Sequence, residues 1–199
     1  MGFEIGNGKI KLQEHIAKKV LAMPDKLDTL LALRSFLGLV NYARPYIQNL
    51  GKLAGPLYSK TTPTRQRHFN QEDIKLVQTI KTIVSKLPEL ALLKVTDFLI
   101  IEIDSCNLGW GAVLYIKPYE YAEKITEEIS RYASDKYKEK GNISSIDAEL
   151  LVISYAINIF QSLLFLTLLP YCGHINLRHK KNNLHYITFE DLKFVENFV

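Results

Sequence analysis

The spacing of apolar residues changes about halfway along the chain. In the first half, two stretches repeat every three or four positions, which is the period of an amphipathic helix. The apolar positions are Leu30, Leu33, Leu37 and Val40, followed by Ile74, Val77, Ile80, Val84 and Leu87. The pattern therefore predicts one helix from about Thr29 to Tyr42 and a second that begins at Asn70, a good N-cap, and stops at Pro88.

Turn residues and charge divide the rest of the first half. Short strands are predicted at residues 3–5 and 9–12, around the turn from Ile5 to Gly8. A basic segment covers residues 14–20, and glycines and a proline predict turns at 50–51 and 55–57. Residues 59–70 are polar and basic, and we expect an exposed loop there. The first half thus predicts a small helical unit of about ninety residues.

The second half alternates strands with a helix. Runs rich in Ile, Leu and Val predict strands at 98–104 and 112–117, a weaker strand at 129–133 and a further strand at 175–178. A long helix begins at Ser144 or Ser145. Its predicted apolar stripe consists of Ile146, Leu150, Ile153, Ile157, Phe160 and Leu164. The order strand, strand, strand, helix, strand indicates an α/β module, and we place the boundary between units 1–92 and 93–199.

Composition narrows the class of protein without identifying it. The 199 residues are 47% hydrophobic and 23% charged, which is ordinary for a soluble globular chain of one large or two small domains. Residues 1–97 carry 15 Lys or Arg against 8 Asp or Glu, whereas residues 98–199 carry 10 against 13. A basic half beside an acidic half suits a grip on a polyanion next to a cation site, and an ordinary solvated surface is the alternative.

Residues 150–169 form a long run without charge that could cross a bilayer by length. Ser154, Asn158, Gln161 and Ser162 interrupt it, which favours a buried helix, and we expect no membrane partner. No targeting signal is found, and the two cysteines form no motif. We therefore expect an intracellular protein, in the cytoplasm or the nucleus.

Several stretches resemble a known family. The run from Leu33 to Ile47, then Asn49 to Leu53 and Gly55 to Tyr58, resembles the thumb of a reverse transcriptase. It is most similar to those of badnavirus-like plant pararetroviruses and, more distantly, of gypsy-type retrotransposons. The resemblance implies that residues 1–92 comprise the end of a palm hairpin and a helical thumb.

The second unit resembles the ribonuclease H (RNase H) domain that follows the thumb in these polyproteins. The matching residues and motifs are Asp104, Gly109-Trp-Gly111, Tyr132-Ala-Ser134 and Ile146-Asp-Ala-Glu149. In the family, the Asp and the Glu are catalytic carboxylates that hold two Mg²⁺ ions, which activate water and stabilise the leaving oxygen. The resemblance therefore implies metal-binding roles for Asp104 and Glu149 and an RNA/DNA hybrid as partner.

The chain departs from the family pattern in two places. The strand that ends in a metal-binding Asp in the family continues here as Arg178-His-Lys180, so that Lys180 takes the position of the third carboxylate. The last carboxylate would lie beyond Val199, and the polymerase palm with its Tyr-x-Asp-Asp strand is absent. These departures predict an RNase-H-like sheet that is incomplete at its C-terminal end and catalytically inactive.

Three functions therefore remain open. The first is an inactive piece of a reverse transcriptase polyprotein that still binds RNA/DNA hybrid or duplex. The second is an active Mg²⁺-dependent endoribonuclease, with Glu102, Asp147 or Asp191 supplying the missing carboxylate. The third is an interaction module without affinity for nucleic acid. The candidate phosphate contacts are Lys18, Lys19, Arg44, Lys60, Arg65 and Arg67.

Overall fold

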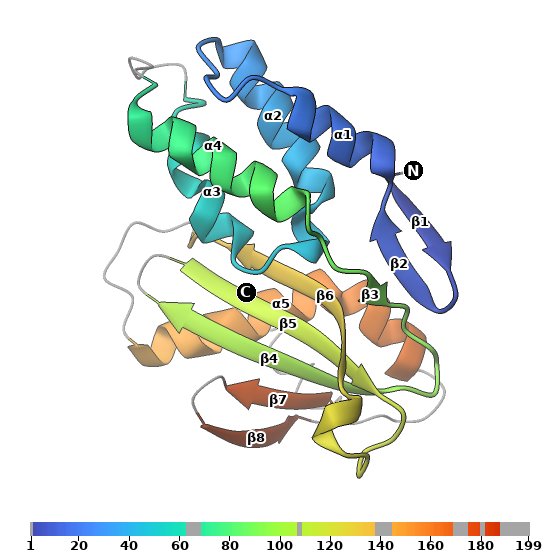
Figure 1. The fold of residues 1–199 in the computed structure, drawn as a ribbon. Helices are drawn as coiled ribbons and strands as arrows, with labels where there is room; N and C mark the ends of the chain where they lie inside the picture. The colour runs from blue at the N-terminus through green and yellow to red at the C-terminus, as the bar shows by residue number, and fades with distance from the viewer. Residues whose placement is uncertain are drawn as a thin grey trace.

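The described part of the protein consists of a helical unit, a small sheet, and a larger sheet with one long helix packed on its face. The structure is a computed structural model and describes residues 2–62, 69–106, 109–137, 145–168, 175–179 and 182–187. Its elements are, in order, β1 (Phe3–Gly6), β2 (Lys9–Leu12), α1 (Glu14–Ala22), α2 (Leu30–Tyr42), η1 (Arg44–Tyr46), α3 (Leu50–Ser59), α4 (Gln71–Val84), β3 (Leu90–Ala91), β4 (Phe98–Cys106), β5 (Gly109–Lys117), η2 (Lys124–Thr126), β6 (Glu128–Asp135), α5 (Ser145–Leu168), β7 (Ile175–His179) and β8 (Asn182–Ile187). Figure 1 shows α1–α4, the helical unit, above the larger sheet, and α5 behind that sheet.

Both helices predicted in the first half are present, with the caps that their sequences provide. The Thr29 hydroxyl accepts a hydrogen bond from the Ala32 amide at 3.1 Å, which begins α2. At α4, the side chain of Asn70 accepts from the Asp73 amide and the Asp73 carboxylate accepts from the Asn70 amide. This reciprocal capping box satisfies amides that would otherwise lack a partner in the first turn.

The helical unit has two further helices that the sequence patterns did not predict. The basic segment after β2 is α1, in which Ile16 and Val20 turn one buried face toward α2 and α4. The predicted turns at 50–51 and 55–57 are wrong, because both lie inside α3. Packing overrides the poor helix propensity of glycine and proline there, since Leu50, Ala54 and Leu57 are fully buried at helical spacing.

The predicted hairpin is confirmed. Asn7 and Gly8 both have positive φ, 51° and 70°, which is the geometry of a tight two-residue turn whose twist suits antiparallel strands. β3 adds to β2 as the third strand of this small sheet, and the chain then passes to the larger sheet.

The larger sheet is mixed, with strand order β6-β5-β4-β7-β8. β4 runs antiparallel to β5 and parallel to β7, with α5 as the crossover between them. We refer to β4–β8 and α5 as the sheet module. The predicted strands are confirmed, and β5 begins at Gly109, three residues earlier than expected.

Helix α5 is present, but its predicted stripe is only partly right. The face packed on the sheet consists of Ala148, Val152, Ala156, Phe160 and Leu164. Leu150, predicted to be inside, is 61% exposed. A helix that is apolar on most sides does not indicate which side faces the core, and here two alanines allow close approach to the sheet. By length and composition alone α5 could also cross a membrane.

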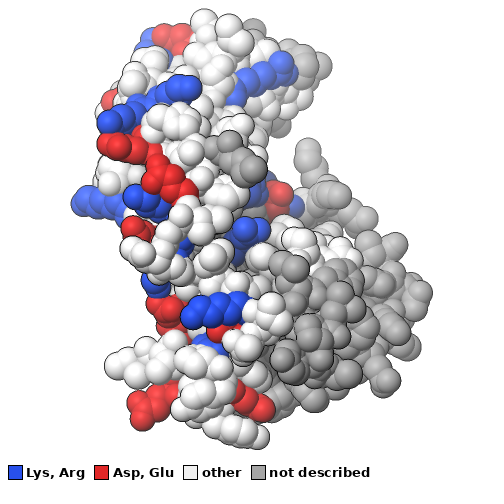
Figure 2. All heavy atoms as spheres, turned by 90° about the vertical axis from the view of Figure 1, so that its right-hand side faces the viewer, with Lys and Arg blue, Asp and Glu red and all other residues white. Residues whose placement is uncertain are grey.

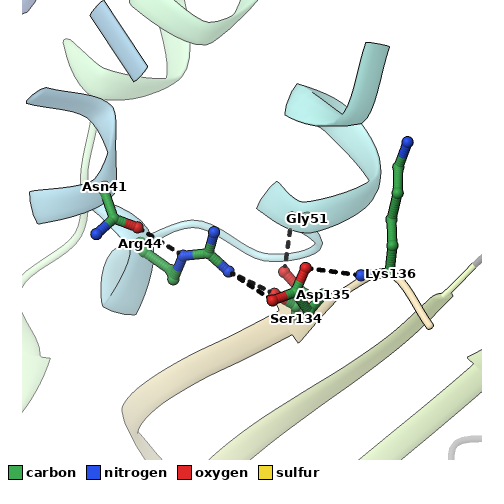
Figure 3. Close-up of polar contacts among 6 residues, drawn as sticks. All are labelled: Asn41, Arg44, Gly51, Ser134, Asp135 and Lys136. Carbon is green, nitrogen blue, oxygen red and sulfur yellow. Dashed lines mark hydrogen bonds and ion pairs between the residues drawn. The ribbon is translucent and has the colours of Figure 1, made fainter. Parts of the chain in front are cut away.

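A polar contact joins the helical unit to the sheet module (Figure 3). The hydroxyl of Ser134, on β6, accepts a hydrogen bond from the Gly51 amide of α3 at 2.9 Å, in a buried position. The guanidinium of Arg44 donates to the Ser134 carbonyl at 2.8 Å and lies 3.8 Å from the Asp135 carboxylate. Asn41 accepts from the same guanidinium at 2.9 Å and thereby orients it. We call the contact made by Arg44, Gly51, Ser134 and Asp135 the module interface.

The module interface also covers the edge strand of the larger sheet. β6 is the outer strand, and Ile129 and Tyr132 on it pack against the core of the helical unit. Exposed sheet edges pair readily with other chains, so covering this one protects the module. Two apolar cores divide near residues 90 and 91. Because the module interface joins them, the division into domains at residue 92 stays a prediction.

Gly51 tests how tightly the two units are packed. A Cβ at position 51 would lie 2.6 Å from the Asp135 Cα, where backbone on both sides leaves no room. We expect Gly51→Ala to lower the free energy of unfolding by about 1–3 kcal/mol, as overpacking does. Gly38 is the matched control, because it lies exposed in α2 with nothing within 4 Å of its Cβ position. Gly38→Ala should raise the free energy of unfolding by about 0.5–1 kcal/mol. Urea unfolding followed by circular dichroism measures both, and equal effects of the two substitutions would contradict the packing shown here.

Candidate active site

Asp104 lies on β4 next to a loop of the helical unit. Its partner across the antiparallel ladder is Gly111, and residues directly opposite each other project to the same side of a sheet. A Cβ at Gly111 would lie 2.4 Å from the Asn49 side-chain oxygen. Asp104 therefore projects toward Asn49, and with Glu102 and Gln48 it lines one shallow pocket. The sheet module and this loop of the helical unit together surround the Asp104 carboxylate.

The Gly-Trp-Gly motif follows from the same crowding. Gly109 has no room for a side chain, because its Cβ would lie 2.5 Å from the Asp135 carbonyl oxygen. Between the two glycines, Trp110 turns to the other face and stacks on Tyr155 of α5, with ring centroids 5.6 Å apart. Trp110 is 6% exposed and belongs to the apolar core of the sheet module.

Glu149 lies in the second turn of α5 and is exposed. The preceding residue, Ala148, is buried, and its carbonyl accepts a hydrogen bond from the Tyr137 hydroxyl at 3.3 Å. Figure 1 shows the start of α5 and the end of β4 at the same end of the sheet module. α5 packs on the face opposite to the one toward which Asp104 projects, since the paired residues Ile103 and Ala112 belong to the same apolar cluster as the buried face of α5. Joint metal binding by Asp104 and Glu149 stays a prediction.

The described residues do not supply a complete metal centre. Among them, no three His, Cys, Asp or Glu side chains lie close enough together to hold a metal ion. Lys180 lies outside the described residues, as does Asp191. The described pairing between β4 and β7 ends at Ile103 and His179, which precede Asp104 and Lys180 by one position each. Mg²⁺ keeps several waters and takes only a few carboxylate oxygens, so weak binding of Mg²⁺ by this chain stays a prediction.

An ion pair that the sequence patterns did not predict holds β7 against its neighbours. The guanidinium of Arg178 binds the Glu127 carboxylate through two hydrogen bonds, at 2.9 and 2.6 Å. Its second acidic neighbour is Glu102, at 3.7 Å, and it lies over the Tyr115 ring. Both members of the main pair are largely buried, with 15% and 7% of their side chains exposed. A single arginine in an apolar strand was the only signal in the sequence, because Glu127 is far away along the chain.

The same contact shifts the pKa values of the two partners. The Arg178 guanidinium lowers the pKa of Glu127 by hydrogen bonding, against the opposing effect of desolvation. The reverse interaction raises the pKa of Arg178. Such charge-assisted, bidentate pairs are geometrically specific. The pair therefore fixes the position of the strand that leads toward residue 180.

The predicted phosphate contacts fall into different environments. Arg44 is part of the module interface, and Lys60 pairs with the buried Asp73 carboxylate at 2.5 Å. Lys18 pairs with Glu14 at 2.8 Å on the exposed surface of α1, and Lys19 is exposed beside it. Arg65 and Arg67 lie outside the described residues. Among the described residues on the face shown in Figure 2, basic and acidic side chains are interleaved.

Comparison with known proteins identifies the family. The family described as "RNase H-like domain found in reverse transcriptase" matches residues 69–168. The chain is 41% identical to Polyprotein P3 of Commelina yellow mottle virus over 162 residues, which are 81% of the chain and 8% of that polyprotein. It is 34% identical to the enzymatic polyprotein of Figwort mosaic virus over 82% of the chain and 24% of the relative. With the enzymatic polyprotein of Cauliflower mosaic virus (strain Strasbourg) it shares 32% identity over 98% of the chain and 27% of the relative.

Solved structures show the same fold. A foamy viral protease-reverse transcriptase in complex with double-stranded DNA superimposes with a TM-score of 0.72 and 19% identity, over 98% of this chain and 31% of that one. The foamy viral enzyme in complex with an RNA/DNA hybrid gives a TM-score of 0.68 at 17% identity, over 90% of this chain and 23% of that one.

The chain belongs to the RNase H-like domains found in reverse transcriptases. More particularly, it is related to the polyproteins of plant pararetroviruses, as its sequence motifs indicate. It spans between 8% and 27% of the length of the relatives named here. RNase H-like domains of this family are typically Mg²⁺-dependent, and the described part of this chain contains no cluster of metal ligands.

The Arg178–Glu127 pair predicts an acid-sensitive contribution to stability. Because the pKa of Glu127 is lower in the folded protein than in the unfolded chain, the pair stabilises the fold above the unfolded-state pKa. That stability is lost as the pH falls through the folded-state pKa, so the free energy of unfolding should drop progressively below about pH 5. Glu127→Gln should flatten this drop, whereas Glu123→Gln, at an exposed position of the same loop, should leave it unchanged. Identical acid limbs for the wild type and Glu127→Gln would show that the pair contributes nothing.

Proposed function

We propose that this chain is the thumb and RNase H-like part of a pararetroviral reverse transcriptase polyprotein, and that it binds RNA/DNA hybrid or duplex without cleaving it. The observation that carries the absence of cleavage is the end of the β4–β7 pairing at Ile103 and His179. In the sequence Lys180 follows His179 directly, and the resemblance to the family implies a metal-binding carboxylate at this position. A lysine there sets a cation beside the metal ions.

The size of this electrostatic effect supports the proposed loss of a metal ion. Two unit charges 4 Å apart interact by about 4 kcal/mol at an effective dielectric constant of 20. Replacing an attractive carboxylate by a repulsive ammonium therefore weakens metal binding twice, once by the lost ligand and once by the added charge. A two-ion mechanism depends on both metals, so the loss of one removes hydrolysis.

Binding of nucleic acid is supported by charge and by fold. The first 97 residues carry a balance of +7, and the exposed Lys18 and Lys19 belong to that half. Both foamy viral structures with the same fold contain nucleic acid, one as double-stranded DNA and one as an RNA/DNA hybrid. Contacts from lysines to phosphates give affinity without sequence preference and depend strongly on salt.

Cleavage is tested directly with an RNA/DNA hybrid labelled on the RNA strand, in Mg²⁺ or Mn²⁺. We expect the RNA to stay intact with the wild type and with Asp104→Asn. Lys180→Asp should raise the affinity for Mn²⁺, measured by the relaxation of water protons, while Lys181→Asp is the control for a change of charge one position away. Hybrid cleavage by the wild type that disappears in Asp104→Asn would instead establish the active Mg²⁺-dependent enzyme.

Binding is tested by titrating a labelled hybrid at several salt concentrations. Affinity should fall steeply with salt, and the double substitution Lys18→Gln with Lys19→Gln should reduce the slope of log K against log salt by about 1.8, if each lysine neutralises one phosphate. Lys124→Gln, in the acidic half, should leave the slope unchanged. Absence of any hybrid affinity at low salt would favour the interaction module without nucleic-acid binding.

A further inference from the structure

Arg131 differs from the other described arginines in having no polar partner. Arg34, Arg44 and Arg178 each donate hydrogen bonds to an oxygen of the protein. Arg131, on the edge strand β6, is half-buried, and its guanidinium makes no hydrogen bond or ion pair with any described residue. Burial lowers the pKa of Arg131, and the nearby Tyr46 partly offsets this effect. A charge withdrawn from water without a partner costs free energy, so this arginine is suited to receive an anion.

A pocket lies beside Arg131, at the meeting point of the small sheet, the helical unit and β6. The residues that line it include Phe3, Tyr42, Pro45, Tyr46, Ser130 and Arg131. Tyr42 is 56% and Phe3 is 41% exposed. The pocket volume is about 130 Å³, below the range of about 300–1,000 Å³ that is typical of sites for whole cofactors or drug-sized ligands. It therefore suits a single small group.

The chemistry of the pocket selects the charge of that group. No Asp or Glu occurs among the described residues that line it, so nothing neutralises the guanidinium from within. Tyr46 and Ser130 also line the pocket, and each carries a hydroxyl that can donate a hydrogen bond. A planar guanidinium matches the oxygens of a phosphate through two parallel hydrogen bonds. Charge, donors and size thus agree on a tetrahedral oxyanion.

We propose that the pocket formed by Tyr42, Tyr46, Ser130 and Arg131 binds one phosphate group. Its source is either a phosphodiester of the nucleic-acid backbone or a free phosphate. The first source rests on the proposed function, because it adds a contact on the sheet module to those of α1. The second source is independent of it.

The first arm of the test uses inorganic phosphate alone and the full chain. In spectra of the ¹⁵N-labelled protein, the Nε–Hε signal of Arg131, assigned by its absence from Arg131→Gln, should shift on titration with phosphate. The signal of Arg34, an exposed arginine on α2, should not shift by a comparable amount. A wild-type Arg131 signal that does not move at any phosphate concentration overturns the proposal.

The second arm uses the labelled hybrid and distinguishes the two sources. For a backbone phosphate, Arg131→Gln should lower the slope of log K against log salt by about 0.9, and Arg131→Lys should restore it because the charge returns. A phosphate-dependent shift of Arg131 with an unchanged hybrid slope assigns the pocket to free phosphate. Failure of the wild type to bind hybrid would contradict the proposed function and leave the first arm to decide the pocket.

Discussion

The whole arrangement depends on the contact between the helical unit and the edge of the larger sheet. The buried hydrogen bond from the Gly51 amide to the Ser134 hydroxyl, with Arg44 beside it, brings a loop of the helical unit over β5 and β6. That approach is possible only because glycines stand where the backbones meet. The same loop then carries Asn49 to the neighbourhood of Asp104. The surroundings of the predicted catalytic carboxylate are therefore built by two segments that are distant in the sequence.

This contact also explains, in physical terms, several of the motifs that the chain shares with its family. Arg44, Asn49, Gly51 and Ser134 all lie in stretches that resemble reverse transcriptases, and all of them meet where the two units join. Their chemistry is that of packing and hydrogen bonding, and none of it requires a metal ion. A chain can thus keep these residues for the sake of its fold while its metal site changes.

The arginines and lysines of this protein fall into two groups, according to whether they pair with a buried carboxylate. Arg178 and Lys60 bind largely buried carboxylates, so their role is structural, since breaking a buried pair leaves a charge without compensation. Lys18 and Lys19 stand in solvent, and Arg131 faces an open pocket. Composition alone cannot distinguish these groups, because the distinction depends on which carboxylates the fold brings within reach.

The sequence by itself determined the helices and strands with a clear period and the caps at Thr29 and Asn70. It also determined the order of strands and helix along the second half of the chain, and the family to which the chain belongs. These features depend on local spacing and on motifs of a few residues, both of which are visible in the sequence. Only the tertiary structure decided that residues 50–57 form a helix and which side of α5 is buried. It also decided the partner of Arg178. In each case the deciding energy comes from contacts between segments far apart in the chain, and such contacts leave no local period to read.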